Sequence, residues 1–150
     1  MAVKMNEVKA ALDVEEPKYD DAAAKFGAGA LPHLGKLVTG DDPLLASKAA
    51  FLAGLIDAEG SHDVLSQAAQ SDHAEVRVAA ANSAANVSNA DSTLFEGLLA
   101  DADAGVRKAA VKSIGSSARV DLKPLVEELA AGDTAAPIRE LAADTARKLK

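Results

Sequence analysis

Apolar positions recur along the chain with a period near 30 residues. The first helix of each repeating unit carries apolar residues at Leu34, Leu65, Phe95 and Val126. The second helix carries them at Leu45, Val76, Val106 and Ile138. Spacings of 31, 30 and 31 residues in the first set and 31, 30 and 32 in the second indicate stacked supersecondary units. Strand signals, such as sustained alternation of β-branched residues or an Asn-Gly turn, do not appear in the sequence.

Polar and glycine-rich breaks divide the chain into about ten short helices. We expect the breaks near residues 13–17, 27–30, 40–43, 57–61, 71–73, 88–92, 101–104, 117–121 and 132–136. At Gly40-Asp41-Asp42-Pro43 an aspartate N-cap precedes proline at the first helical position, which is a strong helix start. The pattern predicts one domain over residues 1–150, with a divergent first hairpin at 1–29 and clearer repeats at 30–150.

The predicted core is made of small aliphatic side chains. Hydrophobic residues make up 49% of the chain, but it has only three Phe, one Tyr and no Trp. Alanine, leucine and valine must therefore fill the interior, and their small volumes let helices approach closely. We expect near-complete burial of Leu65, Val76, Ala80, Leu98, Val106, Ala110 and Leu129.

A short motif repeats at the start of the second helices. An aspartate is followed by Val-Arg-x-x-Ala at Val76–Ala80 and Val106–Ala110, and by Ile-Arg-x-x-Ala at Ile138–Ala142. The first clear unit has Ala46 where arginine is expected. This pattern resembles the HEAT-like repeat, especially the short version of phycobilisome lyase-type proteins. The resemblance implies an all-α, right-handed α-solenoid of about five helical hairpins, with the second helices lining its concave side.

The repeated charged residues suit a structural role. We expect Arg77 and Arg107 to hydrogen-bond to loop carboxylates or carbonyls of an adjacent unit, because the guanidinium fork suits such acceptors. If these side chains instead project into solvent on the concave face, they become binding candidates. Each unit also has an aspartate that is predicted to cap a helix, at Asp42, Asp72, Asp103 and Asp133.

Composition narrows the possible functions. The net charge is −7, and residues 1–75 hold six Lys and no Arg against thirteen Asp or Glu, so we expect no binding to nucleic acid. The absence of cysteine excludes disulfides and thiolate metal sites and fits any redox compartment. No run of 18 apolar residues occurs, so we expect no membrane span, and the absence of an apolar signal at the N-terminus makes the cytoplasm the expected location. His33, His62 and His73 lack metal-ligand spacing, and no nucleophile or phosphate-loop motif occurs. We therefore expect no metal, cofactor or catalytic residue.

The concave face is the remaining candidate for function. Positions two and six residues beyond the repeated apolar residue of each second helix lie away from the core. From these positions we select Phe51, Val78, Asn82, Lys108 and Lys112 as a candidate protein-binding surface. Phe51 has three interpretations: an isolated exposed hydrophobe, a residue buried under the N-terminal hairpin, or an anchor for a partner.

Two functions follow from this surface. The first is a non-enzymatic, monomeric scaffold whose concave face binds a protein or peptide. The alternative is a lyase-like helper or carrier that presents a bilin or other planar cofactor to a client protein, with Lys108 and Lys112 available for its propionates. The irregular first two units argue against a consensus-designed repeat with no client.

Overall fold

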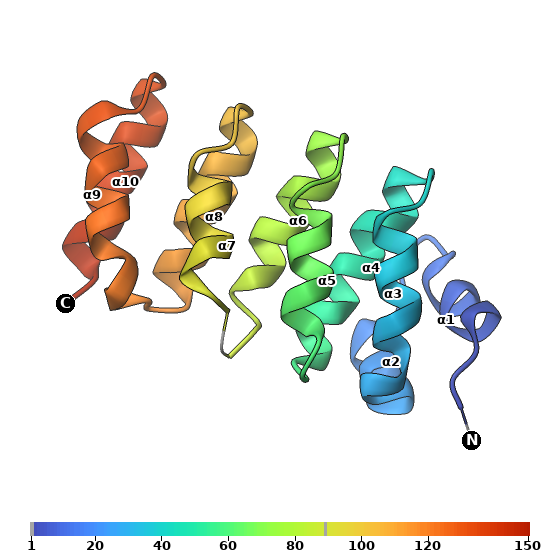
Figure 1. Ribbon diagram of the computed structural model, residues 1–150. Helices are drawn as coiled ribbons and strands as arrows, with labels where there is room; N and C mark the ends of the chain where they lie inside the picture. Colours follow the sequence, from blue (N-terminus) through green and yellow to red (C-terminus); the bar gives the residue numbers. More distant parts are fainter. Residues whose placement is uncertain (1, 89) are drawn as a thin grey trace.

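The computed structural model describes residues 2–88 and 90–150 and contains only helices in these ranges (Figure 1). The elements are α1 (Met5–Leu12), α2 (Tyr19–Phe26), the 3-10 helix η1 (Gly27–Ala30), α3 (Leu31–Val38), α4 (Pro43–Ile56), α5 (Ser61–Ala68), α6 (Ala74–Ala84), α7 (Ser92–Leu99), α8 (Ala104–Ser116), the 3-10 helix η2 (Val120–Leu122), α9 (Lys123–Gly132) and α10 (Ala136–Lys148). The predicted breaks all fall between α-helices. The one near 88–92 includes residue 89, which lies outside the described residues.

The helices pair into hairpins that stack side by side along the molecule (Figure 1). Odd-numbered helices from α3 to α9 form one row and even-numbered helices from α4 to α10 form the other. Neighbouring helices of the even row contact each other more extensively than those of the odd row. The even row is therefore the more closely packed one, and we call the surface that it presents the inner face of the stack. The all-α, HEAT-like solenoid predicted from the repeat is confirmed.

The inner row is close-packed because small residues lie where its helices cross. A Cβ atom on Gly54 of α4 would lie 2.9 Å from the carbonyl oxygen of Ser83 in α6. At the α8–α10 crossing, a Cβ on Gly115 would lie 3.2 Å from Cγ2 of Thr145. Larger side chains at these glycines would push adjacent hairpins apart and change the curvature of the stack.

Most of the predicted core is buried. Six of the seven residues named from the sequence are at most 1% exposed: Leu65, Val76, Ala80, Leu98, Val106 and Ala110. The prediction for Leu129 is wrong, because this side chain is only half-buried. Leu129 lies on α9, which packs against α7, α10 and η2 on one side only, whereas Leu98 lies on α7 between two hairpins.

The N-terminal hairpin departs from the repeat. Helix α1 contacts α2, α3 and α4, and α2 lies along α4 at the N-terminal end of the inner row. The side chain of Lys48 in α4 donates a hydrogen bond to the carbonyl oxygen of Val14, in the turn that follows α1. This hairpin therefore covers the end of the stack. No helix in the described part of the chain has the length and apolarity needed to cross a membrane.

Candidate functional site

Arg77 joins two hairpins through one guanidinium group. Its Nε and Nη2 atoms donate to the two carboxylate oxygens of Asp101, at 2.9 and 3.3 Å. Its Nη1 atom donates to the carbonyl oxygen of Ser71, at 2.9 Å. The arginine thus connects the loop after α5, in its own hairpin, to the loop after α7 in the next one. We call this arrangement an Arg–Asp rung.

Arg107 forms the same rung one hairpin further along. Its Nε and Nη2 atoms donate to Asp133 at 2.8 and 3.1 Å, and Nη1 donates to the carbonyl oxygens of Asp101 and Ala102 at 2.9 and 3.2 Å. The side chains of Arg107 and Asp133 are 12% and 4% exposed. The hydrogen bond from Arg107 lowers the pKa of the Asp133 carboxyl below its ordinary value. Both rungs confirm the structural role predicted for these arginines.

The predicted helix caps are only partly correct. Asp42 accepts hydrogen bonds from the amides of Leu44 and Leu45, and Asp103 caps α8 in the same way. Asp72 and Asp133 do not cap α6 and α10, because those helices begin after His73 and Ala135, one or two residues further on. Asp133 instead accepts from Arg107 and from the Ala135 amide. The four aspartates therefore occupy two different positions: Asp42 and Asp103 are N-caps, whereas Asp72 and Asp133 lie one or two residues before the N-cap.

The five inner-face candidates lie on three adjacent helices, with Phe51 on α4, Val78 and Asn82 on α6, and Lys108 and Lys112 on α8. Asn82 and the two lysines are exposed. Val78 is half-buried against the core. The two lysines are separated by one helical turn, so their ammonium groups lie on the same face of α8.

Phe51 is half-buried against the N-terminal hairpin. Its ring packs edge-on against Tyr19, with 4.7 Å between centroids and 76° between ring planes. Burial raises the pKa of the Tyr19 hydroxyl. Beside the rings is a cleft of about 470 Å³, lined also by Pro17, Lys18, Asp20, Asp21 and Leu55. Phe51 is therefore neither fully exposed nor part of the closed core.

We call Tyr19, Phe51, Leu55 and Pro17 the aromatic corner. Tyr19 was not among the site residues predicted from the sequence. The available signal was the chain's single tyrosine at helical spacing from Ala22, Ala23 and Phe26. That signal does not say which later helix the tyrosine contacts.

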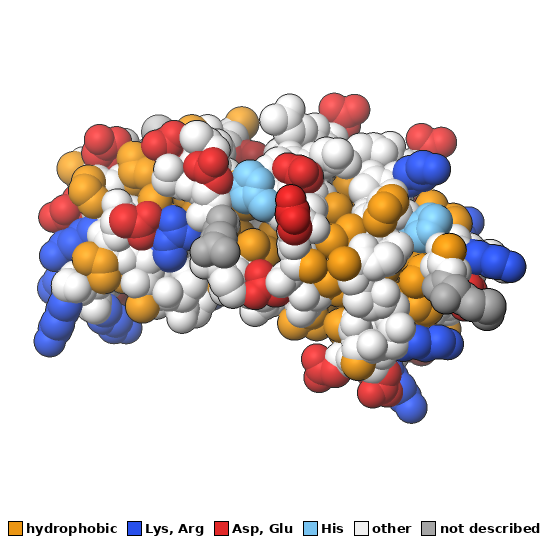
Figure 2. All heavy atoms as spheres, turned by 60° about the horizontal axis from the view of Figure 1, so that its bottom comes forward, with side chains coloured by type: hydrophobic (Ala, Val, Ile, Leu, Met, Phe, Trp, Pro, Cys, Tyr) orange, Lys and Arg blue, Asp and Glu red, His pale blue; other side chains and the backbone are white. Residues whose placement is uncertain are grey.

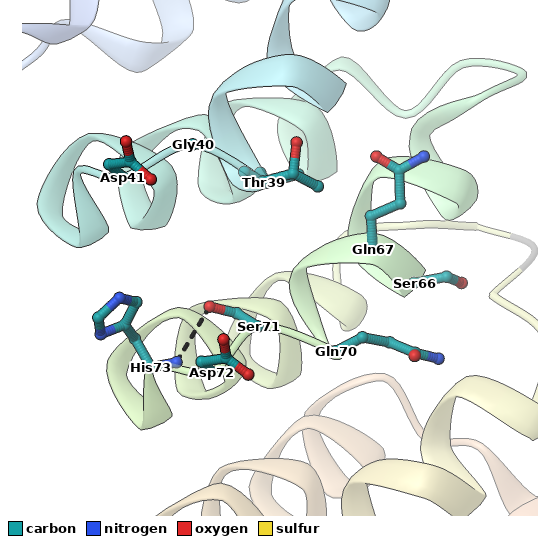
Figure 3. Close-up of a pocket in the computed structure, with 10 residues that line it drawn as sticks. Thr39, Gly40, Asp41, Ser66, Gln67, Gln70, Ser71, Asp72 and His73 are labelled. Atoms are coloured by element: carbon teal, nitrogen blue, oxygen red, sulfur yellow. Dashed lines mark hydrogen bonds between the residues drawn. The ribbon is translucent and has the colours of Figure 1, made fainter.

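A second cleft, of about 540 Å³, opens between the loops that follow α3 and α5. Figure 3 shows Thr39, Gly40 and Asp41 on one side of it and Ser71, Asp72 and His73 on the other. The remaining lining residues are Val38, Ser66, Gln67 and Gln70. We call this the loop cleft. The residues that line it include two aspartates and no lysine or arginine.

Charged side chains are unevenly spread over the surface. In the view of Figure 2, lysine and arginine side chains gather mainly toward the two ends of the molecule, while apolar side chains gather over the N-terminal half. Across the residues that the structure describes, no group of three or more His, Asp or Glu side chains is placed to hold a metal ion. The ring of His33 is used within the fold, since its Nε2 atom lies within hydrogen-bond distance, 2.7 Å, of the carbonyl oxygen of Val3.

Comparison with known proteins supports the fold. No family model matches the chain, and no curated protein matches its sequence. Among solved structures, the chain is similar to one in "the complex of CpcE and CpcF of phycocyanin lyase from Nostoc sp. PCC7120", with a TM-score of 0.73 and 18% sequence identity over 94% of this chain and 96% of that one. At this identity the likeness concerns architecture only. The chain has the fold of a HEAT-like repeat protein, as its sequence motif predicted.

Proposed function

We propose that this protein is a non-enzymatic scaffold that binds a protein or peptide on the inner face of its solenoid, acting as a monomer in the cytoplasm. The observation that carries the proposal is the combination on adjacent inner helices of a half-exposed aromatic corner with exposed Asn82, Lys108 and Lys112. A partly exposed aromatic ring beside a cleft is a typical anchor of a protein interface. The structural neighbour comes from a complex of two proteins, which also favours a protein partner.

The chemistry of this face indicates what the partner presents. Lys108 and Lys112 favour carboxylates, and the aromatic corner favours an apolar side chain. We therefore propose an acidic segment with at least one large apolar residue as the binding element. The partner's apolar residue would occupy the cleft beside Phe51, and its carboxylates would face α8.

The test is a comparison of matched charge reversals. The double variant Lys108→Glu/Lys112→Glu should abolish binding of partners recovered by cross-linking, while its melting temperature stays close to that of the wild type because both side chains are exposed. Lys36→Glu, on the outer helix α3, is the control and should retain binding. Equal binding by both variants would rule out the inner face as the binding surface.

The alternative function is a lyase-like helper that presents a bilin or other planar cofactor to a client. It is favoured by the likeness to a chain from a phycocyanin lyase complex. Lys108 and Lys112 are the inner-face cations that would pair with propionates, and the aromatic corner would contact the ring system. Absorbance spectra after incubation with a bilin or with haem test this function. A shifted band that disappears in Lys108→Glu/Lys112→Glu supports it, and an unshifted spectrum rejects it.

A further inference from the structure

The series of Arg–Asp rungs is interrupted between the α3–α4 and α5–α6 hairpins. The rungs of Arg77 and Arg107 connect the loops after α5, α7 and α9 in order. At the preceding step, Ala46 occupies the position that corresponds to Arg77 and Arg107. No side chain of the described residues bridges the loops after α3 and α5 through a hydrogen bond.

The acceptor of the missing rung has changed together with the donor. Asp101 and Asp133 each accept a hydrogen bond from the amide two residues further on, at 2.9 and 2.8 Å. The Oγ atom of Ser71 accepts the same bond from the His73 amide, at 3.1 Å (Figure 3). Ser71 is thus the structural equivalent of those aspartates, without their charge. The loop geometry is retained, but both charged members of the rung are absent.

The loop cleft lies at this interrupted step. It opens between the two loops that an arginine would otherwise connect, and its volume of about 540 Å³ exceeds that of a side chain. Asp41 and Asp72 line it and are exposed. Within residues 2–88 and 90–150, neither carboxylate has an ion-pair or side-chain hydrogen-bond partner. Two unneutralised carboxylates beside an open volume attract a cation and repel phosphate.

We propose that the loop cleft binds the guanidinium group of an arginine from a partner protein, which takes the place of the missing rung. The equivalent loops hold guanidinium groups at the next two steps, and a planar fork can bridge acceptors on both loops, whereas an ammonium group acts as a point charge. A bound metal ion is a poorer fit, since no cluster of three ligating side chains occurs in the described residues. This site lies on the loops, apart from the inner face, and does not depend on the function proposed for that face.

The test is a titration of the ¹⁵N-labelled full chain with two small probes. N-acetyl-arginine methylamide should shift the amide signals of Gly40, Ser71 and Asp72, and N-acetyl-lysine methylamide should bind several-fold more weakly. Asp72→Asn should lower the affinity for the arginine probe about tenfold, since it removes a charged acceptor. Glu140→Gln on α10 makes the same change in net charge and should leave the affinity unchanged.

A second variant fills the site from within. Ala46→Arg combined with Ser71→Asp supplies both members of the rung and should abolish the response to the arginine probe. Because Ala46 is buried, Asp41→Asn with Asp72→Asn gives an independent test that requires no repacking. Equal responses to the two probes, responses unchanged in the aspartate variants, or no shift at the cleft would each overturn the proposal. Lys108→Glu/Lys112→Glu should not affect this titration, which keeps the test separate from that of the inner face.

Discussion

Replacing Arg107 with alanine removes one complete rung from the stack. The substitution deletes the two hydrogen bonds to Asp133 and those to the carbonyl oxygens of Asp101 and Ala102. It leaves a 4%-exposed carboxylate whose remaining bond is to the Ala135 amide. Breaking a buried ion pair typically costs about 3–5 kcal/mol. Because Arg107 keeps some contact with solvent and Asp133 keeps one donor, we expect a loss of about 2–4 kcal/mol.

The pH dependence of this destabilisation distinguishes the loss of the Arg107–Asp133 ion pair from the loss of apolar packing, which does not depend on pH. The pKa of Asp133 is lowered in the folded protein, so its stabilisation is present above the carboxyl's unfolded pKa of about 3.9 and is lost as the pH falls through the lower folded value. At pH 7 the free energies of unfolding of wild type and Arg107→Ala, measured in urea, should therefore differ by the whole expected loss of about 2–4 kcal/mol. The difference should shrink below about pH 4 as Asp133 takes up a proton.

Arg147→Ala is the matched control. Arg147 pairs with Asp144 on the surface of α10, where both side chains are mostly exposed, so its removal should cost less than about 1 kcal/mol. Equal destabilisation by the two variants would refute the structural role of the rung. So would a cost for Arg107→Ala that stays constant between pH 7 and pH 3.

Three further substitutions test the packing. Val106→Asp places an unpaired charge in a fully buried position and should lower the free energy of unfolding in urea by about 4 kcal/mol. An unchanged free energy of unfolding would show that Val106 is not interior. Gly54→Ala brings a Cβ within 2.9 Å of the Ser83 carbonyl oxygen and should lower the melting temperature, at a cost of about 1–3 kcal/mol; a neutral effect would mean that α4 and α6 separate freely. Phe51→Ala should cost less than the roughly 3–5 kcal/mol of a fully buried phenylalanine, because its ring is half-exposed beside Tyr19; a full core-sized loss would assign Phe51 to structure alone.

The period of apolar positions was sufficient to predict the stack. Leu65, Val76 and Val106 are buried because each occupies the same place in a repeated hairpin, so one register applies along the chain. Leu129 breaks this rule because burial depends on neighbours on both sides, and α9 has them on one. A repeat pattern specifies a residue's position within its unit but not the position of that unit in the stack.

The features that escaped prediction depend on departures from the repeat. Tyr19 reaches Phe51 because the N-terminal hairpin packs differently from the others, and no spacing rule predicts that contact. Ala46 was visible in the sequence as a missing arginine. The equivalence of Ser71 to Asp101 and the open cleft required the loop geometry.

Site-specific photo-cross-linking tests the inner-face proposal most directly. A photoreactive residue would replace exposed Asn82 on α6, in the inner row, or exposed Glu96 on α7, in the outer row. In cells that produce the protein, position 82 should yield a discrete cross-linked partner that disappears in the Lys108→Glu/Lys112→Glu background, and position 96 should yield none. A partner captured at position 96 and not at 82, or one whose capture at 82 is unaffected by the lysine reversals, would contradict binding on the inner face.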